Sequence, residues 1–197
     1  MAHSDPEESA TRGPSDSGGH PVPDGYLDLG ALFVPRIPGL QLRGKFEADK
    51  ETLHQVLLVL GASGVAVSVA AAPKSGGSWP GLAAQIEASV EAAGGEAEEV
   101  SGPYGLEIHA KLAQLTPNGK TVLMPMRILG VEGPRWVARL DIQGPAAAGD
   151  AEQLEAVEDL IDRLIVNRGE SARIKHDLLP LRLPKEAADP TSGQADS

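Results

Sequence analysis

The stretch Gly130–Gln143, GVEGPRWVARLDIQ, contains the clearest strand pattern in the chain. From Arg135 onward, apolar residues alternate with polar ones and occupy every second position: Trp136, Ala138, Leu140 and Ile142. A period of two is typical of a β-strand with one face against a core. The apolar segment 121–131 precedes it, and Glu132-Gly133 is a turn signal. Together these segments predict the central hairpin of an antiparallel sheet.

Further strands and two helices are predicted on either side of this hairpin. One helix begins near Ser78 and ends at Gly94-Gly95. The other begins at Asp150, where Gln153 completes a capping box, and ends at Gly169. The predicted strands are Leu40–Phe46, His54–Leu60, Val65–Ala72, Glu96–Val100 and Leu106–Ala113. We therefore predict an α+β fold: a mainly antiparallel sheet of about seven or eight strands, with both helices packed on one face.

The ends of the chain differ in composition from its middle. Residues 1–25 lack a hydrophobic period and are predicted to be a disordered tail, as are residues 185–197. Residues 26–184 are predicted to form a single domain. Within it, Leu178–Pro184 contains two prolines and four leucines, which predicts an extended segment strapped over the surface of the domain.

Composition and charge exclude several functions. The 197 residues include no cysteine, which excludes disulfides, thiolate metal sites and cysteine nucleophiles. The net charge is −11, and more than half of it lies in the two tails. This charge argues against binding to nucleic acid or to anionic membranes. No apolar run reaches the ~20 residues of a membrane helix, and the first 25 residues do not resemble a secretory signal, so we expect a cytoplasmic protein.

Four motifs together carry a resemblance to a known family. They are LDLGAL at 27–32, APKSGGSW at 72–79, GVEGPRWVAR at 130–139 and DLLPLRLP at 177–184. In combination they resemble an actinobacterial family defined by a domain of unknown function. The resemblance implies an actinobacterial cytoplasmic protein and transfers no catalytic residue. The order of strands and helices is also similar to Mog1/PsbP-like sandwiches, in which helices flank an antiparallel sheet.

The polar face of the predicted sheet is the first candidate site. We expect both helices to cover the face that carries Trp136, Leu140, Ile108 and Leu112. The opposite face then displays a set of charged side chains: His109, Lys111, Arg127, Arg135 and Arg139, with Glu107 and Asp141 among them. Guanidinium groups suit carboxylates and phosphates. This face therefore either binds an acidic group or is a solvated surface with cross-strand ion pairs.

The loop before the first helix is the second candidate. Backbone N–H groups at a helix start attract anions, and Lys74, Gly76 and Gly77 lie where such a group would bind. The alternative is a turn that needs glycine only for its backbone conformation. No spacing of the five histidines matches a metal site, and no nucleophile motif is present.

The sequence thus favours a non-catalytic protein-interaction module with no cofactor. The alternative is a protein that binds a small ligand or anion at the arginine-bearing face and the glycine loop. An enzyme ranks last, because no catalytic constellation is present. The sequence leaves homo-oligomerisation through the sheet open.

Overall fold

The computed structural model describes residues 12–46 and 53–182. Its centre is an antiparallel seven-stranded sheet in the order β4-β5-β6-β10-β9-β8-β7. The strands are β4 (Gln41–Phe46), β5 (Leu53–Leu60), β6 (Ser63–Ala71), β7 (Glu96–Gly102), β8 (Gly105–Leu115), β9 (Thr121–Gly133) and β10 (Trp136–Gln143). The predicted α+β class and strand number are confirmed, and the predicted hairpin is β9–β10.

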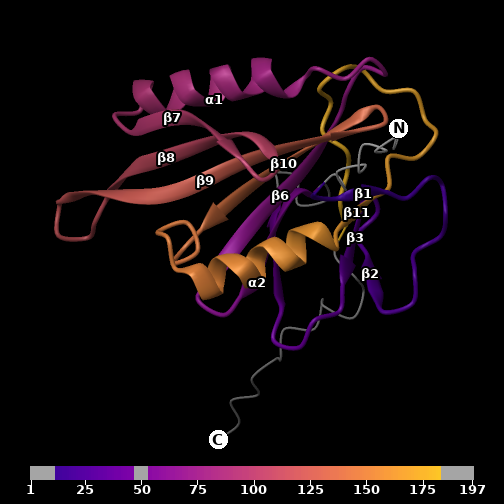
Figure 1. Cartoon of the computed structure of the whole chain (residues 1–197), viewed down its shortest axis with the longest axis horizontal. Coiled ribbons are helices and arrows are strands. Elements are labelled where there is room, and N and C mark those ends of the chain that lie inside the picture. Colours follow the sequence, from indigo (N-terminus) through magenta and orange to yellow (C-terminus); the bar gives the residue numbers. More distant parts are fainter. Residues whose placement is uncertain (1–11, 47–52, 183–197) are drawn as a thin grey trace, which may run out of the picture.

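A smaller sheet lies beside the large one (Figure 1). Its order is β1-β11-β3-β2, from β1 (Ser15–Asp16), β2 (Tyr26–Asp28), β3 (Leu32–Pro35) and β11 (Ile165–Val166). Residues 12–25 were predicted to be disordered, which is wrong because β1 pairs with β11 and the indole of Trp136 donates to Asp16. Residues 1–11 and 185–197, the rest of the predicted tails, lie outside the described residues.

The two helices, α1 (Trp79–Ala92) and α2 (Ala151–Asp162), lie on opposite faces of the large sheet (Figure 1). Helix α1 packs on β7, β8 and β9 through a small cluster that includes Ile108 and Val137. Helix α2 belongs to the main core, with Trp136 and Leu140 of β10. The prediction that both helices cover one face is therefore wrong.

Strand register explains the two faces. Leu140 of β10 lies opposite Leu129 of β9, which in turn lies opposite Glu107 of β8. Side chains alternate along a strand, so Ile108 faces the other way from Leu140. The apolar side chains of β8 and those of β10 therefore lie on opposite faces of the sheet. Helix α1 packs against the first set and helix α2 against the second.

Trp79 fixes α1 to the sheet. Its indole N–H donates to the carbonyl of Leu106 at 2.6 Å, and its ring lies flat against Gly130 of β9. A Cβ at Gly130 would be 1.8 Å from Cδ2 of Trp79. Only glycine therefore permits this contact.

The C-terminal segment is strapped across both sheets, as predicted. Leu179 N–H donates to the carbonyl of Val69, and Leu181 forms isolated bridges to Gly30 and Leu53. Leu179 and Leu181 are buried, whereas Leu178 remains exposed. Among the described residues, no helix is long and apolar enough to span a bilayer.

Two glycine variants test the packing of Trp79. Gly130→Ala should lower the free energy of unfolding by about 3 kcal/mol, because the new methyl group displaces the indole. Gly81→Ala, on the first turn of α1 with no atom near its Cβ position, should instead raise it by about 0.5–1 kcal/mol. Urea denaturation measures both, and equal effects of the two substitutions would contradict this packing.

Candidate functional site

A row of polar side chains crosses three neighbouring strands on the α2 face. His109 of β8 lies opposite Glu98 of β7 on one side and Arg127 of β9 on the other. The next row contains Lys111, whose ammonium group is 2.7 Å from a carboxylate oxygen of Glu96. The structure thus brings together three of the predicted site residues, His109, Lys111 and Arg127.

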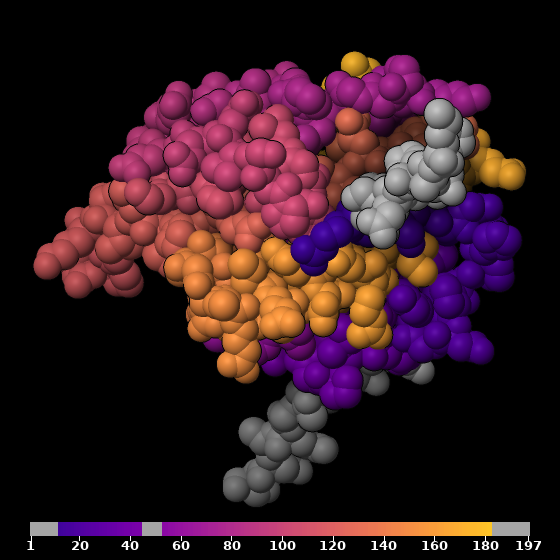
Figure 2. Space-filling model, viewed as in Figure 1, coloured from indigo at the N-terminus to yellow at the C-terminus, as the bar shows by residue number. Residues whose placement is uncertain are grey.

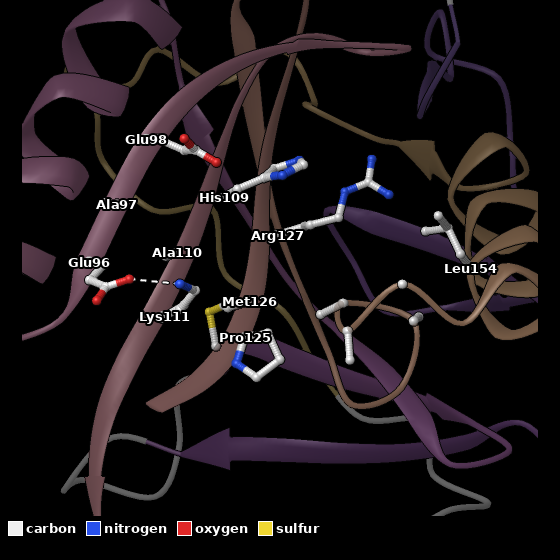
Figure 3. A pocket seen from close by; sticks show the side chains of 14 residues that line it. Glu96, Ala97, Glu98, His109, Ala110, Lys111, Pro125, Met126, Arg127 and Leu154 are labelled. Carbon is white, nitrogen blue, oxygen red and sulfur yellow. Dashed lines mark hydrogen bonds and ion pairs between the residues drawn. The ribbon is translucent and has the colours of Figure 1, made fainter. Parts of the chain in front are cut away.

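These residues line one side of a cavity of about 530 Å³, which we call the α2-side cavity (Figure 3). The opposite side is formed by Leu154 at the start of α2 and by the loop 146–149 that precedes the helix. Asp150 caps α2 by accepting from the N–H of Gln153, as predicted, and this hydrogen bond fixes the point where the loop ends and the helix begins. The cavity therefore has a charged wall on the sheet and an apolar wall on the loop and helix.

A buried ion pair lies beside this cavity. Glu107 is fully buried, and its carboxylate accepts from Arg127 Nη2 at 2.8 Å. Space for the carboxylate exists because position 102 on β7 is glycine, where a Cβ would be 2.0 Å from Glu107 Oε1. The Nε2 atom of His109 lies 3.4 Å from the same carboxylate.

The ion pair extends to α2 and the N-terminal segment. Arg127 lies 3.5 Å from Glu158, and Arg12 contacts both Glu158 at 3.1 Å and Asp162 at 2.8 Å. The hydrogen bond to Asp162 raises the pKa of Arg12, so this guanidinium stays charged. Arg12 also lies over the ring of Tyr104, 4.9 Å from its centroid, and burial raises the pKa of that phenol.

The cluster carries more negative than positive charge. Three carboxylates, those of Glu107, Glu158 and Asp162, meet two guanidinium groups, those of Arg12 and Arg127. Three of its buried atoms also have no hydrogen-bond partner among the described residues: Glu107 Oε1, His109 Nε2 and Arg127 Nε. Such atoms are uncommon in folded proteins and call for an explanation, of which a functional role is one.

Arg139 lies on the opposite face of the sheet, toward α1. Its Nε donates to Asp141 at 2.8 Å, and it borders a mostly apolar groove between α1 and the sheet. Burial raises the pKa of Asp141, and the positive charge of Arg139 partly offsets that effect. The predicted single face bearing all the arginines does not exist, because Arg127 and Arg139 point to opposite sides.

The glycine loop binds a carboxylate of the same chain. Glu132 accepts from the N–H groups of Gly77 at 3.1 Å and Ser78 at 2.6 Å, while the Ser78 side chain makes no cap. Gly76 and Gly77 adopt positive φ angles of 67° and 76°, as the turn interpretation expects, and Lys74 is exposed. The position predicted for a bound anion is thus filled by Glu132.

Arg135 lies in the β9–β10 turn with a φ of 65° and does not line the α2-side cavity; its backbone carbonyl accepts from the N–H of Ala72, just before the glycine loop. In the described part of the chain, no group of three or more His, Asp or Glu side chains is placed to hold a metal.

Sequence reasoning missed Arg12, Glu158 and Asp162 as members of the cluster. The four-residue spacing of Glu158 and Asp162 was an available signal, since it places both carboxylates on one side of a helix where they can share a cation.

The fold and cavity define a class: an α+β protein with a seven-stranded sheet between two helices and a charged cavity under the second helix. The chain belongs to the family described as "Protein of unknown function (DUF3710)", which matches residues 13–190. The predicted membership in a family with a domain of unknown function is thereby confirmed.

One solved structure has a limited similarity to this chain. It is the solution structure of cyanobacterial PsbP (CyanoP) from Synechocystis sp. PCC 6803, with a TM-score of 0.42 and 11% sequence identity. The alignment covers 72% of this chain and 91% of that one. No curated protein matches the chain.

Replacing Arg127 tests the buried ion pair. Arg127→Ala leaves the Glu107 carboxylate buried without its cation, so the free energy of unfolding should fall by about 3–5 kcal/mol in urea denaturation. Adding Glu107→Gln to that variant should recover part of the loss. Lys111→Ala, which breaks an exposed ion pair on the same face, is the matched control and should change stability little. Equal losses for the two single variants would contradict a buried pair.

Asp141 tests the electrostatics of the α1 face. Burial raises the pKa of its carboxyl in the folded state, so the stability this group contributes is full at acidic pH and falls as pH rises above about 4. Asn carries no ionisable proton, so Asp141→Asn should become more stable relative to the unmodified protein as pH increases from 4 to 7. Urea unfolding across this range measures the difference, and a pH-independent difference would contradict it.

Proposed function

We propose that this protein binds a small molecule bearing an amine, in the α2-side cavity. The observation that carries the proposal is the charge of the sheet wall: three carboxylates, those of Glu96, Glu98 and the buried Glu107, lie at or beside this wall with two cations, Lys111 and Arg127. The opposite wall of the cavity is apolar. Binding of a small ligand was the alternative function predicted from the sequence.

The size and lining of the cavity support a small organic ligand. A volume of about 530 Å³ lies in the range typical of small-molecule sites. Leu154, Ala146, Ala147 and Pro125 offer apolar contacts to the body of such a ligand. The β-strands that carry the polar residues are part of the large sheet, so these side chains are held on a rigid support.

The charges around the cavity support a cationic rather than an anionic group. Glu96 and Glu98 border it, and the fully buried Glu107 lies next to His109 and Arg127. Lys111 is occupied by Glu96, and Arg127 by Glu107 and Glu158. An ammonium group placed near Glu98 and His109 would offset the excess negative charge, whereas an anion would add to it. We therefore propose an amine, and not the anion expected from the sequence, as the ligand of this cavity.

Titration with a matched pair of small ions tests the proposal. n-Butylammonium should shift the backbone amide NMR signals of residues 96–98, 109–111 and 146–149 and reach saturation, while n-butyrate should leave them unchanged. Glu98→Gln should weaken the binding of n-butylammonium about five-fold, because it removes one exposed negative charge.

Glu91→Gln is the control, because it removes the same charge from the exposed side of α1 on the other face of the sheet. The proposal fails if butyrate binds as well as butylammonium, or if the two glutamate variants weaken binding equally.

Protein interaction, the function favoured by the sequence, stays a prediction. What supports it is the end of the β8–β9 hairpin, which extends beyond the rest of the molecule and carries exposed apolar side chains (Figure 2). They are Leu115, Val122, Leu123 and Met124.

A further inference from the structure

Arginines gather at a second cavity, on the side of the small sheet. It measures about 430 Å³ and is bordered by Arg168, Arg173 and Arg182, together with Asn167 and Ser171. We call it the arginine cavity. Among the described residues that line it, none is acidic. In a chain with a net charge of −11, this concentration of positive charge is unexpected.

Backbone carbonyls, rather than carboxylates, hold the guanidinium of Arg168. Its Nε donates to the carbonyl of Arg135 at 3.3 Å, and its Nη1 donates to those of Gly169 and Ser171 at 3.3 and 2.5 Å. These bonds orient the planar group but do not neutralise it. Arg168 is partly exposed, and among the described residues no carboxylate pairs with its guanidinium.

The surrounding charges add to this imbalance. Burial, followed by the positive charges of Arg135 and Arg173, lowers the pKa of Arg168. Arg182 is partly compensated, since its Nη2 lies 3.6 Å from Asp28. Glu170, between Gly169 and Ser171, is exposed and does not line the cavity. Arg168 and Arg173 are therefore the two cations for which a ligand would supply the counter-charge.

We infer that the arginine cavity binds the phosphate group of a small phosphorylated molecule. Guanidinium groups present parallel N–H donors that match phosphate oxygens, and a doubly charged group would offset both cations. Asn167, which also lines the cavity, is held by hydrogen bonds that its backbone and side-chain N–H groups donate to the carbonyls of Ala31 and Gly30. This site shares no residue with the α2-side cavity and does not depend on the function proposed there.

Titration with inorganic pyrophosphate, inorganic phosphate and glycerol phosphate tests the inference. At least one of them should shift the backbone amide signals of residues 167–173 and 181–182 in a saturable way. Tighter binding of glycerol phosphate than of inorganic phosphate would identify an organic ester as the ligand, and the reverse order would identify the free ion.

Two variants and a control make the test specific. Arg173→Gln, which removes an exposed cation, should weaken binding about five-fold or more. Arg168→Lys keeps the charge but loses the planar fork, and should also weaken binding. Arg43→Gln, an exposed arginine on β4, should leave binding unchanged. The inference is overturned if no phosphate compound shifts these signals at about 10 mM, or if Arg43→Gln weakens binding as much as Arg173→Gln.

Discussion

The pairing register of β9 with its two neighbours is the constraint on which the rest of the structure depends. Because Leu129 lies between Leu140 and Glu107, one face of the sheet takes the aliphatic side chains of β10, and the other takes those of β8. Each face then needs its own cover, which α2 and α1 provide. The same register places Glu107, His109 and Lys111 on the α2 face of the sheet, where Glu107 is fully buried and Lys111 remains exposed. A shift of one residue would exchange these faces and dissolve the charged cluster.

This arrangement buries the charged pair of Glu107 and Arg127 next to the α2-side cavity, and the burial of these charges disfavours folding. The pair formed by Glu107 and Arg127 contributes little net stability, since removing both charges from water offsets most of their attraction. Apolar residues would fill the same space more favourably. The proposed binding of an amine would give these charged groups a role beyond stability, since the carboxylates beside the α2-side cavity would supply the counter-charge.

Local sequence patterns predicted the strands of the large sheet and both helix starts, but they placed the end of α2 at Gly169 instead of Asp162 and predicted the arrangement of the elements less well. The alternation from Trp136 to Ile142 was sufficient for a strand, and Asp150 with Gln153 was sufficient for a helix start. Which residues of β8 share a face with those of β10 depends on the pairing registers of the β8–β9 and β9–β10 hairpins. The sequence pattern within either strand does not contain this information. For that reason Ile108 was assigned to the wrong face, and Arg139 was grouped with Arg127 although the sheet separates them.

Long-range contacts account for the remaining differences. Arg12 lies in a polar segment without any hydrophobic period, and only its partners on α2 show that it belongs to the folded domain. Ser78 is the N-cap of α1, as predicted, but its side chain makes no cap hydrogen bond; its N–H instead donates to Glu132, more than fifty residues away in the sequence. The sequence identified the donors of the glycine loop but not their acceptor, because acceptor and donors meet only after the sheet has formed.

Strand β7 forms one edge of the large sheet, and its outer side has unpaired backbone groups that another strand could join. Glu96, Glu98 and Glu99 leave this edge with carboxylates on both of its faces. Two copies brought together along β7 would place these like charges side by side, which opposes pairing. Like-charge repulsion along this acidic edge therefore opposes its extension by a second copy, and two of the three glutamates, Glu96 and Glu98, also border the α2-side cavity.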